Sequence, residues 1–324
     1  MHRVTKSAFM LFAMQLIPVT GYADKPSCAR SLYELETPSG YQHARFAPEP
    51  VERFYDGKGF IASIDSEDDD DLVLGGDAEG ERLAGPVWVA YHLKAFHEPE
   101  GDGFAPGWKR PRDWYKDPAF DQEREHYDTR KRLDNSYDGV GNTWNRGHLA
   151  QRADLNRLGP RYGCNSHTFA NAIPQHRDLN QGIWLGLENY LSGLANEVGE
   201  VWISSGTIFD GPIRSIHDEE KGEIPVAIPD RLWKAAVWFN GDELKSGAWI
   251  YPNVSKDEDP RYKSGKCSKD KRYDHQPFVS SIAEIEAVTG LQFFTEHEQR
   301  EALLTAKLEA LPAVSDSLQV GQCR

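Results

Sequence analysis

The spacing of apolar side chains predicts one long amphipathic helix near the middle of the chain, over residues 178–198. The side chains that recur at spacings of three and four and form a single stripe are Ile183, Trp184, Leu187, Leu191 and Leu194. Asp178, with Gln181 three positions later, fits a capping box at the helix start. A shorter helix is expected within Ser280–Phe294, where serines precede the apolar positions and Gly290 is suited to a left-handed cap.

Alternating or β-branched stretches predict strands on both sides of the long helix. The first is Gly85–Ala95, where Val87, Val89, Tyr91 and Leu93 share one face. Glu200–Gly211 and Leu232–Phe239 are rich in β-branched and aromatic residues, and the prolines of Ile224–Asp230 confine it to an edge or a loop. The proline and aspartate content of Trp108–Phe120 favours an extended loop. Strands and helices that alternate without βαβ periodicity indicate an α+β fold.

The N-terminus is typical of a secretory signal peptide. Arg3 and Lys6 precede an apolar run, Ala8–Val19, which ends in small residues around Ala23. The run is about 12 residues, shorter than the roughly 20 that span a bilayer as a helix. We therefore expect residues 1–23 to be removed and residues 24–324 to form a single periplasmic or secreted domain, with a core at about 85–295 and no membrane span.

Four cysteines follow this segment: Cys28, Cys164, Cys267 and Cys323. An oxidising compartment favours two disulfides over free thiols, and three pairings are open. The formal net charge is −14, so a polyanion would need a local basic patch rather than a general electrostatic attraction. The acidic run Ile64–Asp71 is expected to be a solvated loop.

The stretch "WNRGHLA", Trp144–Ala150, combines the residue types that phosphodiester chemistry requires. His148 titrates near neutral pH and can accept a proton, and Arg146 offers a planar cation that matches phosphate oxygens. In a strand these two side chains fall on one face, and Gly147 between them allows a neighbouring backbone or ligand to approach. The long helix adds Asn180 and Glu188, whose oxygens suit a hard cation such as magnesium.

The ordered motifs over Asn145–Glu188 resemble those of the DNA/RNA non-specific endonucleases, the ββα-metal group that includes secreted bacterial nucleases and mitochondrial endonuclease G. The residues that carry the resemblance are Asn145-Arg146-Gly147-His148, Asn171-Ala172-Ile173-Pro174-Gln175, Leu179-Asn180-Gln181-Gly182-Ile183-Trp184 and Leu187-Glu188. Weaker similarity runs from Pro86 to Phe294. The resemblance implies a ββα-metal finger fold with a central, mostly antiparallel sheet flanked by helices.

The resemblance also implies an activity and its residues. His148 would be the general base, Asn180 the direct ligand of Mg²⁺, with Mn²⁺ as a possible substitute, and Glu188 a carboxylate that holds metal-bound water. Asn171 would support them, and Arg112 and Arg146 would act on the scissile phosphate. Substrates would be DNA and RNA, cut with little sequence specificity to leave 5′-phosphate ends. The sequence does not give the oligomeric state.

One position departs from the family's pattern, because Asn145 stands where an aspartate is usual. An active enzyme with altered tuning is the preferred interpretation, and a catalytically inactive nucleic-acid-binding protein of the same fold is the alternative. A second alternative is a zinc site made of Cys164, His167 and His176.

Overall fold

A seven-stranded antiparallel sheet forms the centre of the protein, in the order β1-β2-β3-β6-β9-β10-β11. The computed structural model describes residues 26–65, 84–96, 107–115, 136–217, 223–262 and 273–314. The strands are β1 (Arg53–Asp56), β2 (Ile61–Ile64), β3 (Pro86–Lys94), β6 (Glu200–Ile208), β9 (Arg231–Asn240), β10 (Glu243–Pro252) and β11 (Val279–Ser280). The predicted signal peptide, most of the acidic run, residues 116–120, Cys267 and Cys323 lie outside the described residues.

The strands predicted at Gly85–Ala95, Glu200–Gly211 and Leu232–Phe239 are confirmed as β3, β6 and β9. Both faces of β3 are buried. Val89, Tyr91 and Leu93 pack into one core cluster as expected, whereas Val87 packs with Trp88 on the opposite face. The reason is a bulge, since Ser63 pairs with Trp88 while Ile64 pairs with Pro86, which leaves one extra residue in β3.

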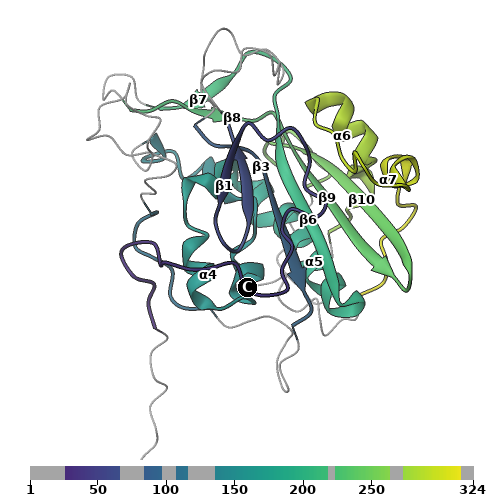
Figure 1. Ribbon diagram of the computed structural model, residues 1–324. Coiled ribbons are helices and arrows are strands. Elements are labelled where there is room, and N and C mark those ends of the chain that lie inside the picture. Colours follow the sequence, from purple (N-terminus) through teal and green to yellow (C-terminus); the bar gives the residue numbers. More distant parts are fainter. Residues whose placement is uncertain are drawn as a thin grey trace, which may run out of the picture.

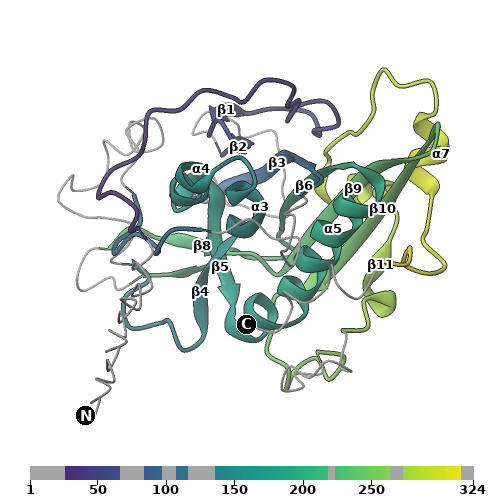
Figure 2. The same ribbon diagram turned by 90° about the horizontal axis from the view of Figure 1, so that it is seen from below.

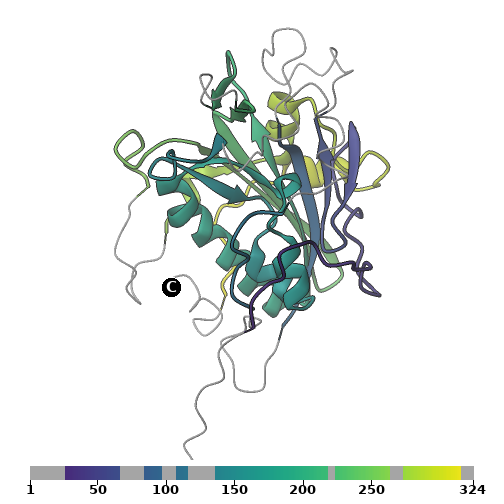
Figure 3. The ribbon, with the colours of Figure 1, turned by 90° about the vertical axis from the view of Figure 1, so that its left-hand side faces the viewer.

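Helices cover the two faces of the sheet (Figures 1 and 2). One face packs against α5 (Trp184–Val198), and the other packs against α6 (Ile282–Thr289) and α7 (Arg300–Thr305). Figure 3 shows α5 and the C-terminal helices on opposite sides of the sheet. This arrangement confirms the α+β fold with an antiparallel sheet flanked by helices.

The predicted short helix is confirmed as α6. Ser281 and Glu284 form a reciprocal capping box at its start, and Gly290 ends it with φ +71°. The long helix begins later than predicted. Residues Leu179–Ile183 form a π-helical turn, η2, that contains a non-helical Gly182, and α5 starts only at Trp184. The predicted capping box is wrong, because Asp178 makes no side-chain cap and accepts the Lys256 N–H instead.

Two smaller sheets and one disulfide complete the described structure. Strand β4 (Trp144–His148) pairs with β5 (Ala172–His176), and β7 (Arg214–Ile216) pairs with β8 (Val226–Ile228), so Ile224–Asp230 includes an edge strand as expected. Between β4 and β5 lie α3 (Arg152–Asn156), α4 (Pro160–Asn165) and the 3₁₀ turn η1 (Phe169–Asn171), and a second 3₁₀ turn is η3 (Gln276–Phe278). Cys28 is bonded to Cys164. No helix in the described parts of the chain has the length and apolar character needed to cross a membrane.

Candidate active site

Two antiparallel strands and the helix that follows them carry the predicted chemistry. Strand β4 pairs with β5, with His148 opposite Ala172 and Arg146 opposite Pro174. The chain then passes through η2 into α5, and Figure 2 shows β4 and β5 side by side next to the start of α5. The unit lines a cleft of about 900 Å³. His148, Arg146, Asn180 and Glu188 all lie on its wall, so the structure brings together four of the six predicted site residues.

Gly147 is required by the close packing of the two strands. A Cβ atom at this position would lie 2.3 Å from Oε1 and 2.5 Å from Cβ of Gln175, which is fully buried on β5. Contacts that short do not occur between real side chains, so any larger residue would push β4 away from β5. The glycine between Arg146 and His148 therefore keeps the strand that carries both of them in place.

The surroundings of His148 fix which ring nitrogen is free. The Ser166 hydroxyl donates its hydrogen to Gly163 O at 2.8 Å, so its oxygen can only accept from His148 Nε2 at 3.3 Å. The proton of a neutral imidazole is then on Nε2, and Nδ1 carries the lone pair. Trp114 and His167 hold the ring from two sides, each with centroids 4.9 Å from that of His148.

The electrostatic environment keeps His148 unprotonated. Burial lowers its pKa well below the ordinary value of 6.5, and the neighbouring His167, Arg110 and Arg152 lower it further. A neutral imidazole with a free Nδ1 can accept a proton throughout the neutral range. This is the protonation state that a general base needs.

Asn171 lies next to His148 but does not line the cleft. Its side chain is fully buried, accepts the Ala150 N–H at 2.8 Å, and donates to the carbonyl oxygens of Ala150 at 3.0 Å and Ser166 at 3.1 Å. These bonds fix the backbone of Ala150, two residues after His148, and of Ser166, whose hydroxyl contacts the His148 ring. Asn171 is thus placed to position the site rather than to touch a substrate.

Asn145 fixes the orientation of Asn180. Nδ2 of Asn145 donates to Gly141 O at 3.2 Å, and its Oδ1 accepts from Asn180 Nδ2 at 3.0 Å and from Gln181 Nε2 at 2.9 Å. With Nδ2 held in this way, the opposite Oδ1 of Asn180 accepts no hydrogen bond within the described parts of the chain. The neutral amide at position 145 accepts these donors just as a carboxylate would, but it adds no charge.

Glu188 supplies the acidic group of the cleft. It is 5 % exposed, and its Oε1 accepts the indole N–H of Trp184 at 3.1 Å. Burial raises its pKa to about 8, while the buried ammonium of Lys234 acts in the opposite direction. Among the described residues that line the cleft, Glu188 is the one carboxylate.

Three arginines make the cleft basic in an acidic protein. Arg110, Arg146 and Arg152 line it. Because the net charge of the protein is −14, a polyanion needs a local basic patch of this kind in order to bind. Arg146 packs on the ring of Tyr137, 5.0 Å from its centroid, and Arg152 donates to Trp108 O. Arg112 is exposed and does not line the cleft.

Sequence reasoning missed several residues of this site. Arg110 and Trp114 stand in the extended loop, which is held to the rest of the fold by bridges from Lys109 to Ser27 and from Tyr115 to Thr168. Arg152 lies two residues after the motif stretch Trp144–Ala150, at the start of α3. No local pattern marks them, because their place in the cleft depends on contacts with residues far away in the chain.

The zinc alternative is wrong. Cys164 is bonded to Cys28 and is not a thiolate, and Nδ1 of His167 donates to Cys164 O at 3.1 Å. In the described ranges, no group of three or more His, Cys, Asp or Glu side chains is arranged to hold a metal ion. The donor set of the cleft, one amide oxygen from Asn180 and one carboxylate from Glu188, instead fits a hard cation that keeps most of its waters.

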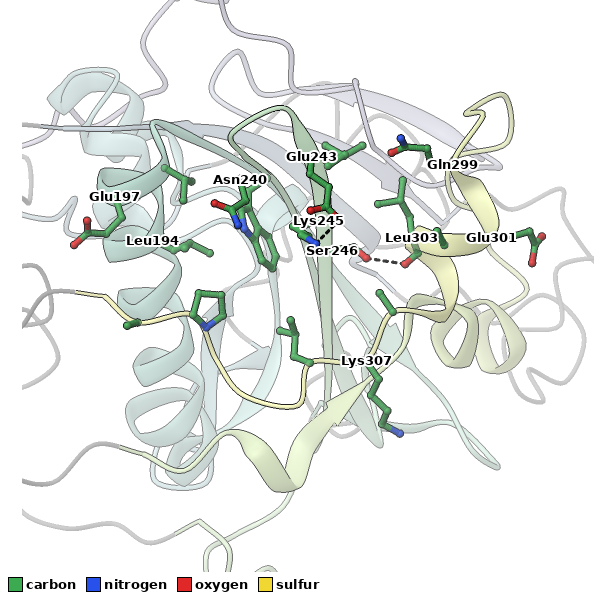
Figure 4. A pocket seen from close by; sticks show the side chains of 18 of the residues that line it. Leu194, Glu197, Asn240, Glu243, Lys245, Ser246, Gln299, Glu301, Leu303 and Lys307 are labelled. Carbon is green, nitrogen blue, oxygen red and sulfur yellow. Dashed lines mark hydrogen bonds and ion pairs between the residues drawn. The ribbon is translucent and has the colours of Figure 1, made fainter.

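A second cavity of about 900 Å³ lies away from the cleft, between the end of α5, the β9-β10 hairpin and α7 (Figure 4). Its lining includes the carboxylates of Glu197, Glu243, Glu298 and Glu301 and the ammonium groups of Lys245 and Lys307. It contains none of the predicted site residues.

Comparison with known proteins identifies the family. Residues 79–300 match the DNA/RNA non-specific endonuclease family. The chain belongs to this family. The match covers more than half of the chain and includes every residue of the cleft described above. The family's members are metal-dependent nucleases.

Individual relatives agree with this assignment. The chain is 28% identical over 167 residues to "Nuclease EXOG, mitochondrial" of Homo sapiens, covering 48% of this chain and 41% of the relative. It is 27% identical over 207 residues to "Nuclease" of Serratia marcescens, covering 63% and 66%. The chain thus spans less than half the length of the mitochondrial relatives it matches.

The fold is similar to that of a solved structure, the EndoG/EndoGI complex. It has a TM-score of 0.51 and 18% identity, and it covers 80% of this chain and 91% of that one. At this identity, the similarity supports the fold alone.

Proposed function

We propose that the protein is a magnesium-dependent endonuclease that hydrolyses the phosphodiester bonds of DNA and RNA. The observation that carries the proposal is the cleft in which a neutral histidine with a free Nδ1 faces three arginines, an amide oxygen and a carboxylate. Membership of the endonuclease family supports it. The protein acts in the periplasm or outside the cell after residues 1–23 are removed, as one nuclease domain over residues 24–324.

The residues of the cleft divide the work of hydrolysis. His148 Nδ1 takes a proton from the attacking water, because its own proton is held on Nε2 by Ser166. Arg110, Arg146 and Arg152 bind phosphate oxygens and stabilise the charge that grows in the transition state. Asn171 holds the backbone after His148 so that the ring keeps its place.

Asn180 and Glu188 would hold Mg²⁺, or Mn²⁺ in its place. The bound cation supplies compensation for the charge on the phosphate and on the departing 3′ oxygen. Asn145 orients Asn180 toward this role through the Asn180 Nδ2 hydrogen bond. Departure of the 3′ oxygen leaves 5′-phosphate and 3′-hydroxyl ends. Since the contacts are to phosphate and cation rather than to base edges, cleavage has little sequence specificity.

The test is incubation of a closed circular plasmid and of a single-stranded RNA with the mature protein, with Mg²⁺ and with a chelator, followed by analysis of the product ends. Cleavage of both substrates with Mg²⁺ alone, leaving 5′-phosphates, is expected. Binding of both without cleavage would support the inactive binding protein instead. Cleavage that persists in the chelator would refute the metal requirement.

A further inference from the structure

The centre of β9 carries a charged side chain in a fully buried position. Lys234 is 0 % exposed and is among the largest fully buried side chains of the described structure. Burial of an ammonium group is unfavourable unless hydrogen bonds and opposite charges compensate it. Burial accordingly lowers the pKa of Lys234 to about 8, and the nearby Glu188 and Asp154 act in the opposite direction. The role proposed above for the cleft does not use this lysine.

Lys234 contacts the residue after His148 and the tryptophan that is hydrogen-bonded to Glu188. Its Nζ donates to Ser205 Oγ on β6 at 2.6 Å and to the carbonyl oxygen of Leu149, the residue after His148, at 3.3 Å. It also lies 4.5 Å from the ring centroid of Trp184. The face of this indole thus meets the ammonium group, while its N–H donates to Glu188 Oε1.

The chain directly after His148 is held from two sides. Leu149 N–H donates to Asn171 O at 3.1 Å, and Leu149 O accepts from Lys234. Both polar backbone groups of Ala150 bond to the Asn171 side chain. The N–H and C=O groups of both Leu149 and Ala150 are therefore hydrogen-bonded. Three of these four bonds are made with Asn171 and one with Lys234.

The charged groups that face Lys234 come from two helices. Glu188 lies on α5, and Asp154 lies on α3, where it accepts from the hydroxyls of Tyr91 at 2.9 Å and of Ser192. Arg157, whose guanidinium donates to the carbonyl oxygens of Lys94 and Ser192, also acts on Asp154.

We propose that Lys234 is a positioning residue of the active site. Its ammonium group fixes the carbonyl oxygen that follows His148 and packs on the indole face of Trp184, whose N–H donates to Glu188. It thereby couples the general base on β4 to Glu188 on α5. The inference rests on the proposed function of the cleft, which Lys234 itself does not line.

The test replaces the charge while keeping the size of the side chain. In Lys234→Met, kcat for plasmid cleavage is expected to fall about tenfold while KM stays within about twofold, because the carbonyl oxygen after His148 loses its donor. Lys234→Gln, which retains a donor for Leu149 O, should recover most of kcat. Ser205→Ala is the matched control, since it removes a hydrogen bond but leaves the ammonium group, and its kcat should stay close to that of the wild-type protein.

A second measurement does not depend on activity. Denaturant unfolding is compared for the wild-type protein, Lys234→Met, Trp184→Leu and the double variant at neutral pH. Because the ammonium group and the indole face are in contact, the double variant should lose less than the two single losses combined.

The outcomes distinguish a failure of the Lys234 role from a failure of the proposed nuclease function. Cleavage by the wild-type protein, with an unchanged kcat in Lys234→Met and additive unfolding losses, would overturn the role of Lys234 alone. A folded wild-type protein that cleaves nothing, together with non-additive losses, would refute the proposed function and support the contact between Lys234 and Trp184.

Discussion

The cleft beside β4 and the cavity beside α7 have the same volume, about 900 Å³ each, and opposite chemistry. In the cavity the two lysines are already engaged, Lys245 with Glu243 and Lys307 with Glu284. In the cleft three arginines face one carboxylate, Glu188. Concavity alone therefore does not distinguish the proposed active site from the second cavity. The arrangement of charge around a neutral histidine distinguishes it.

The largest expected effect is at the base. His148→Ala should lower kcat by about 10²- to 10⁴-fold, because a positioned general base typically contributes that much. His297→Ala, which changes a histidine that does not line the cleft, should stay within about twofold. Initial rates of plasmid cleavage, with circular dichroism to confirm the fold, measure both. Near-wild-type turnover by His148→Ala would remove this residue from the role.

The next effect is on the metal requirement as pH changes. Burial raises the pKa of Glu188 to about 8, so below pH 8 the carboxyl group holds a proton that the cation must displace. The Mg²⁺ concentration for half-maximal activity should fall by up to about tenfold per unit as pH rises from 6 to 8. His148 does not add to this dependence, because its pKa lies well below 6.5. A metal requirement that is constant over this range would contradict the assignment of Glu188.

A smaller effect is expected to distinguish Arg146 from Arg112, for which the sequence predicts the same role on the scissile phosphate. Arg146→Met should raise KM roughly tenfold and lower the salt slope of binding by about one, since it removes one phosphate contact. Arg112→Met should leave both within about twofold, because Arg112 is exposed outside the cleft. Cleavage rates over a salt series decide between them. The reverse ranking would restore Arg112 to the site.

The smallest effect is expected in the second cavity. Glu197→Gln and Glu301→Gln remove negative charge from its wall and should change kcat/KM for DNA by less than about twofold. A tenfold gain on either change would show that nucleic acid passes over this face as well, and the contrast between the two regions would no longer hold.

The sequence predicts the parts of the fold that local pattern determines. The stripe from Ile183 to Leu194 is buried as expected, and the Ser281 and Gly290 caps bound α6. It does not predict β10, whose lysine, serine and glycine give no strand pattern, yet which pairs with β9 over ten residues. Tertiary pairing overrides local propensity there. The π-helical turn that displaces the start of α5 gives no local signal either.

The same contrast between local sequence pattern and tertiary packing applies to the site. The motif residues His148, Arg146, Asn180 and Glu188 lie together because β4, β5 and α5 form one compact unit. Arg110, Arg152 and Lys234 are found only once distant segments are packed. The motifs therefore give the proposed general base and the proposed cation-holding residues, whereas two of the three proposed phosphate-binding arginines and the buried lysine depend on tertiary packing.

The most direct test of the account is a crystal structure of the His148→Ala variant with a short deoxyoligonucleotide and Mg²⁺. The account predicts a phosphate group in the cleft, in contact with Arg146 and close to residue 148, with the cation held by Asn180 and Glu188. An oligonucleotide bound in the α7 cavity, or on any face that leaves the β4-β5-α5 cleft empty, would contradict it.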